Sequence, residues 1–378
     1  MATISPLRDR HVEHEASFIP FGEGDSVAEV AETFGPLELE YAAIRRGCAL
    51  FDMTQRATVR VTGADRVEFL NNMVTQELKG IAPGTSTKSF WLSRKGRIDA
   101  DLRVVHTEDA TWFDCDTLCA ARTVESLSGY LFSEDVELAD VTAERHRLVL
   151  AGPTAPRVLA ALGAEAPDVV DTNTHATIAG AGVVIDRHDD TGSPTFDLHL
   201  RVEDLPAVYD AIAQVDESLR VKRAGWHAYN IARIEAGTPL YHLDFGPDSL
   251  PAESGVLRDR VDFKKGCYLG QEVVARMDAL GHPKQILRGL RLPAARHPDP
   301  EHQPTTGAPV LPTDSDEKVV GGVTSSTRSP MLGDDVVCFA QIKWKHAEAH
   351  NRVRVMTGAG TSETEVLEGL AFYAPAEA

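Results

Sequence analysis

A cysteine between two glycines is the part of this sequence whose residue types could most readily do chemistry. Residues 265–272 read Lys-Gly-Cys-Tyr-Leu-Gly-Gln-Glu, and Lys264 and Lys265 precede Cys267. Neighbouring cations lower the pKa of a thiol, which suits a nucleophile, a redox sensor or an iron–sulfur ligand. A single cysteine cannot hold a cluster alone. A tight turn with a half-buried thiol is the alternative, and the spacing by itself favours that structural interpretation.

Two carboxylates form a second candidate site. Asp99 and Asp101 lie two residues apart in the strand-like run 98–105, so both should point to one face of the strand. Such a pair can act as general acid and base, or can hold a cationic amine. Exposed faces of antiparallel strands also carry such residues, and the pattern alone favours this simpler interpretation.

An arginine at the end of a helix rich in small residues is the third candidate. This helix is expected over residues 224–236 and stops at Gly237. Arg233 could pair with Glu235, or it could bind a substrate carboxylate through two hydrogen bonds. Tyr241, just beyond the helix, offers a ring for stacking. A cation near a helix C-terminus is also an ordinary stabilising feature.

Composition limits the classes of protein that these residues could serve. The chain has 378 residues, of which 43% are hydrophobic and 25% charged, which suggests two or three globular domains of about 150 residues. With 57 acidic and 38 basic residues, the net charge of −19 disfavours general nucleic-acid binding, although a local basic cluster could still bind an anion. The sequence lacks a run of about 18 apolar residues and an apolar leader, so we expect no membrane segment and a cytoplasmic location. The five scattered cysteines are not a disulfide framework, and no metal site is expected.

The elements that must position these residues alternate between strands and helices, as in an α+β protein. A helix is expected over residues 26–47, and residues 241–283 should be irregular. From residue 287 onward, short strands with glycine-rich turns predict a small β-barrel or sandwich. Further strands are expected over 58–63, 90–92, 98–105, 112–116, 136–141, 147–151, 183–186 and 196–202, and helices over 117–131, 155–162 and 203–215.

A series of short motifs resembles the glycine-cleavage T-protein superfamily of tetrahydrofolate-binding proteins over nearly the whole chain. The motifs are residues 46–52, 61–65 with 69–71, 96–102, 152–153, 233–237, 239–241, 251–253 and 322–326. Within that superfamily, residues 265–272 and their continuation over 274–277 resemble the YgfZ-type branch. Members of that branch bind folate and support iron–sulfur enzymes.

The resemblance implies an α+β fold of three domains in a cloverleaf, with ferredoxin-like α+β domains and a C-terminal β-barrel. The implied boundaries are a discontinuous folate-binding domain over 1–50 and 144–245, a second α+β domain over 51–143, a connecting segment with the cysteine motif over 246–285, and a barrel over 286–378.

The resemblance also assigns catalytic roles to two residues. Asp101 aligns with the acidic residue near the reactive part of folate in the T-proteins. A carboxylate there could hold the amine or stabilise a cationic iminium during transfer. Cys267 would be the functional thiol of the YgfZ-type motif.

Four other residues are implied to bind tetrahydrofolate. Arg233, Tyr241 and Glu253 fall within the family motifs. The pterin-binding glutamate of the family is replaced by Ser193, so the pterin-facing carboxylate would have to be Asp197. An aspartate is shorter by one methylene group, which suggests folate binding with altered geometry.

Three functions remain open from the sequence. The first is a tetrahydrofolate-binding YgfZ-like protein that supports iron–sulfur cluster assembly or repair, with folate, iron–sulfur enzymes and cluster-assembly proteins as its partners. The second is a tetrahydrofolate-dependent aminomethyltransferase or a related methyltransferase. The third is a scaffold that has lost folate. We expect the first, because the cysteine motif selects it within the superfamily.

Overall fold

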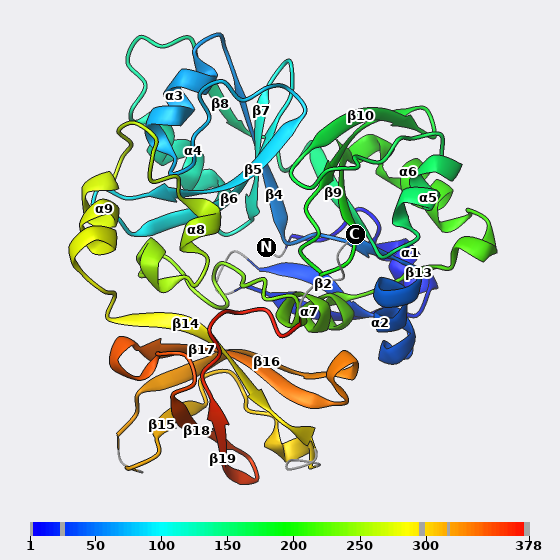
Figure 1. The fold of residues 1–378 in the computed structure, drawn as a ribbon. Coiled ribbons are helices and arrows are strands. Elements are labelled where there is room, and N and C mark those ends of the chain that lie inside the picture. The colour runs from blue at the N-terminus through cyan, green and yellow to red at the C-terminus, as the bar shows by residue number, and fades with distance from the viewer. Residues whose placement is uncertain (1–2, 23–26, 295–298, 316–317, 374–378) are drawn as a thin grey trace. The chain divides into compact units, whose positions relative to one another are not determined.

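The structure is a computed structural model that describes residues 3–22, 27–294, 299–315 and 318–373. Its internal contacts divide the chain into two units. Unit 1 comprises residues 1–91, 99–229 and 264–268, and unit 2 comprises residues 92–98, 230–263 and 269–378. Strands and helices alternate along the chain (Figure 1), which confirms the mixed α/β character expected from the sequence.

A six-stranded sheet forms one core of unit 1. Its strand order is β10-β11-β12-β9-β3-β13, and all neighbours are antiparallel except the parallel pair β13 and β3. The central strand β12 is buried at every residue but its last, which is typical of a strand covered on both faces. The strands are β3 (Cys48–Asp52), β9 (Arg145–Ala151), β10 (Asn173–Ile178), β11 (Ala181–Arg187), β12 (Thr195–Arg201) and β13 (Val221–Arg223).

A five-stranded sheet, in the order β5-β6-β7-β4-β8, carries the predicted carboxylate pair. In β6, Ile98, Ala100 and Leu102 are buried and alternate with the charged residues Asp99 and Asp101, as a strand with one apolar face requires. The strands are β4 (Arg56–Thr62), β5 (Thr85–Leu92), β6 (Ile98–His106), β7 (Thr111–Asp116) and β8 (Glu137–Asp140). A two-stranded ribbon, β1 (Ser17–Phe21) with β2 (Ala28–Thr33), completes the strands of unit 1.

The helices of unit 1 bury apolar faces against these strands. In α6, Leu205, Val208, Tyr209 and Ile212 are buried at helical spacing within the core of the six-stranded sheet. The helices are α1 (Arg8–Glu13), α2 (Leu37–Arg46), α3 (Arg66–Met73), α4 (Ala120–Ser128), α5 (Ala155–Ala161) and α6 (Leu205–Ala213), and α7 (Trp226–Glu235) continues into unit 2. Among the helices in the described part of the chain, none is long and apolar enough to cross a membrane.

Unit 2 is built around a curled six-stranded sheet in the order β14-β17-β16-β15-β18-β19. A bridge between Leu290 in one edge strand and Val366, just past the other edge strand, brings the two edges together, which confirms the barrel-like expectation. The strands are β14 (Gln285–Leu292), β15 (Pro309–Pro312), β16 (Gly321–Ser329), β17 (Asp335–Lys343), β18 (Arg352–Thr357) and β19 (Gly360–Glu365), and the helices are α8 (Leu257–Arg260) and α9 (Gln271–Leu280).

Two expectations about elements were wrong. The segment 26–47, expected as one helix, forms strand β2 followed by helix α2. Every second residue of β2 from Ala28 to Val30 is buried, and the strand pairs with β1, which is the pattern of a strand. Ser26 itself lies outside the described residues. Residues 241–283 are not irregular throughout. They contain α8 and α9. Helix α9 begins at Gln271, directly after Gly270, whose left-handed φ of +83° ends the preceding loop.

Gly96 in the turn between β5 and β6 gives a test of how closely α9 packs on that turn. Its φ is +70°, and an added Cβ would lie 2.7 Å from the Cβ of Val273 on α9. We predict that Gly96→Ala lowers the free energy of unfolding, measured by urea titration, by about 2–4 kcal/mol, because backbone strain and steric overlap add.

Gly307→Ala is the matched control, because Gly307 has a φ of +84° but no atom within 4 Å of the added Cβ. This variant should lose only about 1 kcal/mol, from the strained backbone alone. Equal losses in the two variants would contradict the packing described for α9.

Candidate functional site

Asp101 lies on the charged face of β6, between two residues with defined partners. Asp99 pairs with Arg122 of α4 at 3.2 Å. Burial raises the pKa of Asp99, and the charge of Arg122 opposes this shift. Arg103 follows on the same face of the strand. Asp101 itself is half-buried, so it is partly open to solvent.

Arg103 joins the two sheets of unit 1. Its Nε and Nη2 donate to the two carboxylate oxygens of Asp186 on β11, each at 2.8 Å. Nη2 also donates to the carbonyl of Arg187 at 2.8 Å, and Nη1 bonds to Asp171. Two parallel bonds between a guanidinium and a carboxylate fix both position and orientation. The pair therefore holds β6, and with it Asp101, against the six-stranded sheet.

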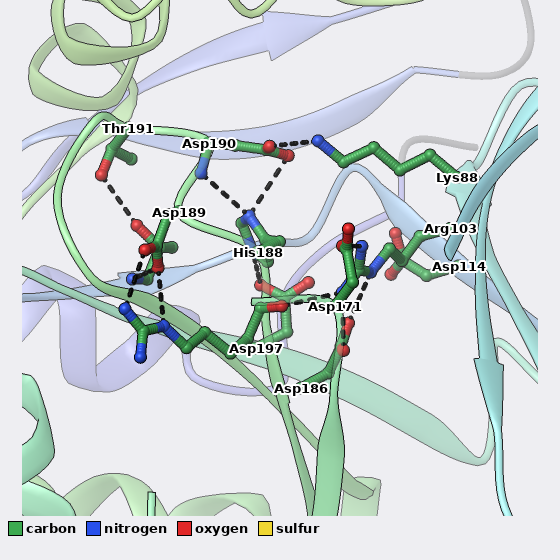
Figure 2. Close-up of polar contacts among 12 residues, drawn as sticks. Lys88, Arg103, Asp114, Asp171, Asp186, His188, Asp189, Asp190, Thr191 and Asp197 are labelled. Carbon is green, nitrogen blue, oxygen red and sulfur yellow. Dashed lines mark hydrogen bonds and ion pairs between the residues drawn. The ribbon is translucent and has the colours of Figure 1, made fainter. Parts of the chain in front are cut away.

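Asp197 lies in the centre of a buried ion network, which Figure 2 shows. The side chain is completely buried on β12. One carboxylate oxygen accepts a hydrogen bond from Arg147 of β9 at 2.7 Å, and the other contacts Nε2 of His188 at 2.8 Å. The same Nη1 of Arg147 donates to Asp114 of β7 at 3.0 Å, which adds a second link between the sheets.

The network continues from His188 toward β5. Nδ1 of His188 lies 3.2 Å from the carboxylate of Asp190, and Asp190 pairs with Lys88. Burial alone would lower the pKa of His188, but the charges of Asp197 and Asp190 outweigh it and raise that pKa to about 10. Burial would likewise raise the pKa of Asp197, but Arg147 and His188 hold it below its usual value. This upward shift favours the charged form of His188 beside the two buried carboxylates.

One group in this region has the spacing of a metal site. Ligand atoms of Asp186, Asp197 and His199 lie within 4.8 Å of one another. Both oxygens of Asp186 are bonded to Arg103, and both oxygens of Asp197 are bonded to Arg147 and His188. Since protein cations already neutralise these carboxylates, the arrangement is a set of ion pairs and gives no support for a metal centre.

Arg233 of α7 bonds entirely within unit 2. Its side chain is 1% exposed. The guanidinium donates to Asp244 at 2.5 Å, to the hydroxyl of Ser325 at 2.7 Å and to the side-chain oxygen of Asn230 at 2.9 Å. Asp244 in turn accepts from Ser325 at 2.7 Å. Arg233 therefore ties the end of α7 to β16, and the suggested pairing with Glu235 does not form, because Glu235 accepts from Ser329 instead.

Tyr241 and Glu253 are also buried and bonded within unit 2. The hydroxyl of Tyr241 donates to the carbonyl of Ile98 at 2.9 Å. A carboxylate oxygen of Glu253 accepts from the backbone N–H of Leu250 at 2.9 Å and caps a short turn. Both side chains shape the backbone around them, and their predicted contact with folate stays a prediction.

Cys267 is exposed, and the ammonium of Lys265 is bonded to backbone carbonyls elsewhere in unit 1. The ammonium of Lys265 is buried and donates to the carbonyls of Asn71 at 2.7 Å, Val74 at 2.8 Å and Gln76 at 2.8 Å. These carbonyls lie in and just beyond the last turn of α3, where backbone acceptors lack helical partners and a cation is favoured. The motif lysine is therefore a structural clamp, with its ammonium directed at these three carbonyls.

Sequence reasoning missed the partners of Asp197. Arg103 lies between Leu102 and Val104, and Arg147 directly precedes the apolar run 148–151 of its strand. A charge within a buried strand requires a partner. That signal could have marked both arginines as members of an ion network. The identity of their partners, Asp186 and Asp197, follows only from the strand pairing.

The fold is shared with a solved aminomethyltransferase. The crystal structure of glycine cleavage system aminomethyltransferase T from Bartonella henselae matches 99% of both chains with a TM-score of 0.86 at 22% identity. Residues 7–265 match the model of the GCVT N-terminal domain. This chain belongs to that glycine-cleavage T-protein family, as its motifs indicated.

Curated relatives extend the match over most of the chain. The aminomethyltransferase of Frankia alni is 30% identical over 331 residues, which cover 87% of both chains. The aminomethyltransferase of Anoxybacillus flavithermus is 27% identical over 350 residues, or 89% of both chains. The similarity therefore runs beyond the N-terminal domain and includes the C-terminal region.

These relatives correct the functional prediction. The prediction of a YgfZ-like protein for iron–sulfur cluster assembly or repair was wrong, because the relatives are aminomethyltransferases and none of them points to that role. The YgfZ-type branch is likewise not confirmed. Two residues of the segment 265–272 have structural roles, which weakens this segment as a marker of function. Lys265 bonds to the end of α3, and Gly270 packs closely against Leu92 and Ser93.

We predict that Lys265→Met lowers the free energy of unfolding by about 2–4 kcal/mol, because three carbonyls lose a charged donor. Urea titration measures this loss. Lys264→Met, at the exposed neighbouring position, is the control and should change stability by less than about 0.5 kcal/mol. Similar losses in both variants would show that the clamp does not form.

His188 makes stability depend on pH on the alkaline side. Its pKa rises from 6.5 to about 10 on folding, so its contribution is complete below pH 6.5 and is lost as the pH rises toward 10. Urea titrations at intervals from pH 6 to 10 should therefore show a fall on the order of a few kcal/mol.

His188→Gln should be less stable at pH 7 and should show a flatter pH dependence over the same range. His175→Gln, on the exposed face of β10, is the control and should keep the wild-type slope. An unchanged slope in His188→Gln would contradict the protonation state assigned to the network.

Proposed function

We propose that this chain catalyses tetrahydrofolate-dependent transfer of an aminomethyl group. The observation that carries the proposal is the similarity to aminomethyltransferases over most of the chain, which covers 87–89% of this chain and of two relatives. A match that spans both chains supports a shared activity more strongly than a match to one domain would. The partners would be tetrahydrofolate and a carrier protein that delivers the aminomethyl group.

Asp101 is the residue that we propose to act in the transfer. A carboxylate attracts positive charge that develops on a transferred amine, and this effect is strong where water is partly excluded. Asp101 is partly buried, so solvent screens it less than a surface carboxylate, yet it remains open enough to meet a ligand. Its strand is held by the Arg103–Asp186 pair, which keeps the carboxylate in one place.

The other residues predicted to bind tetrahydrofolate fit that ligand less well. Both oxygens of Asp197 are bonded to protein cations, so neither is presented to a pterin. Arg233, Tyr241 and Glu253 are buried and bonded to protein groups. In this proposal they stabilise the structure, and tetrahydrofolate supplies the acceptor nitrogen when it binds.

We predict that Asp101→Asn lowers kcat for aminomethyl transfer at least about 100-fold, because the charge is lost while the shape is kept. The assay measures methylene-tetrahydrofolate formed from tetrahydrofolate and an aminomethyl-loaded lipoyl carrier protein. Asp109→Asn, in the exposed turn after the same strand, removes the same charge and should stay within about two-fold of wild type.

Two outcomes would contradict this proposal. Wild-type protein that forms no product with the loaded carrier is not an aminomethyltransferase, and product formed only from a methyl donor would identify a related methyltransferase instead. Full activity of Asp101→Asn would remove Asp101 from the reaction. Equal thermal midpoints of wild type and variant ensure that a lost activity reflects chemistry.

A further inference from the structure

Three arginines from three strands line one open cavity in unit 1. They are Arg60 of β4, Arg145 at the start of β9 and Arg201 at the end of β12, and Trp112 of β7 lies among them. The cavity has a volume of about 670 Å³. Small-molecule sites commonly measure about 300–1,000 Å³. A cluster of cations in a chain with a net charge of −19 stands out against the rest of the molecule.

Strand register forces these side chains together. Arg145 and Arg201 are directly opposite each other on antiparallel neighbours β9 and β12. Arg60 is directly opposite Trp112 on β4 and β7. The guanidinium carbon of Arg145 lies 4.9 Å from the centre of the Trp112 ring. Like charges at directly opposite positions destabilise a strand pair, so the arrangement lowers stability in the absence of a counter-charge.

The protein itself neutralises this cluster only in part. Burial lowers the pKa of Arg145, and the charges of Arg201 and Arg60 lower it further, whereas the charge of Asp204 opposes them. The buried Nε of Arg145 has no hydrogen-bond partner among the described residues, and Nη2 makes one bond, of 3.3 Å, to a carbonyl. Two carboxylates also line the cavity, those of Glu144 and Glu203.

Neither carboxylate reaches the centre of the cluster. Glu203 pairs with Arg201, and the two side chains are 63% and 59% exposed, which makes the pair weak. Glu144 is exposed. A ligand anion could therefore displace Glu203 from Arg201 with little loss of free energy, and it would also contact Arg60 and Arg145.

We propose that this cavity binds a small anion that carries at least two phosphate or carboxylate groups. Guanidinium groups recognise both kinds of oxyanion through paired hydrogen bonds, and three of them exceed what a single charge requires. Val141 and Val202 provide apolar wall for the body of such a ligand. None of the residues predicted to meet folate lines this cavity, so the site is separate from the proposed transfer reaction.

Calorimetric titration tests the site with two probes, pyrophosphate for phosphate groups and citrate for carboxylates, at ionic strength matched with potassium chloride. We expect wild-type protein to bind at least one probe saturably. The double variant Arg60→Gln/Arg201→Gln should bind that probe at least about ten-fold more weakly, because two charged contacts are lost. The probe that binds more tightly identifies the chemistry of the ligand.

The control is Arg258→Gln/Arg352→Gln, which removes two exposed arginines of unit 2 that are paired with Asp278 and Glu363. It should keep wild-type affinity. The probe should also raise the thermal midpoint of wild type and control but not of the cavity variant, since a bound ligand stabilises the folded state. Absence of saturable binding to wild type, or equal affinity in the cavity variant, would overturn the proposal.

Discussion

The bidentate ion pair between Arg103 and Asp186 is the interaction on which the rest of unit 1 depends. It joins β6 of the five-stranded sheet to β11 of the six-stranded sheet, and both side chains are buried. A buried charge that loses its partner is strongly destabilising, whereas a satisfied pair fixes a unique arrangement of the elements that carry it. Arg147 adds a parallel link through Asp114 and Asp197. The two sheets are therefore held in one register by charge as well as by apolar packing.

This constraint separates residues that hold the fold from residues that can meet a ligand. Some charged residues of the kind found in binding sites are bonded to other protein groups. They are Asp197, Arg233 and Lys265. Asp101 lies two residues before Arg103 on a strand that is fixed in place, and its side chain is partly open to solvent. A carboxylate that is held by its strand needs little reorganisation during a reaction, which is the condition for electrostatic catalysis.

The sequence predicted much of the fold but only part of the site. The sequence alone predicts that Asp99 and Asp101 lie on one face of a strand. Their alternation with the apolar residues Ile98, Ala100 and Leu102 is a local pattern. The ion pairs of Asp197 could not be predicted in this way. Strand β12 is buried on both faces and shows no alternation, and Arg147, which bonds to Asp197, lies 50 residues earlier in the chain. The sequence shows Lys265 only as a neighbour of Cys267. Its hydrogen-bond partners could not be predicted, because these carbonyls lie about 190 residues earlier in the chain. The fold and family followed from ordered motifs, whereas the weight given to one motif led to the wrong function.

A double-mutant cycle on Arg103 and Asp186 tests the central claim most directly. Arg103→Met, Asp186→Leu and the double variant are compared with wild type by urea titration. We predict that each single change is strongly destabilising, by about 3–5 kcal/mol, and that the double variant is more stable than the sum of the two losses requires by at least about 2 kcal/mol. Losses that simply add would contradict the account, because the two side chains would then act independently and could not fix the strand that carries Asp101.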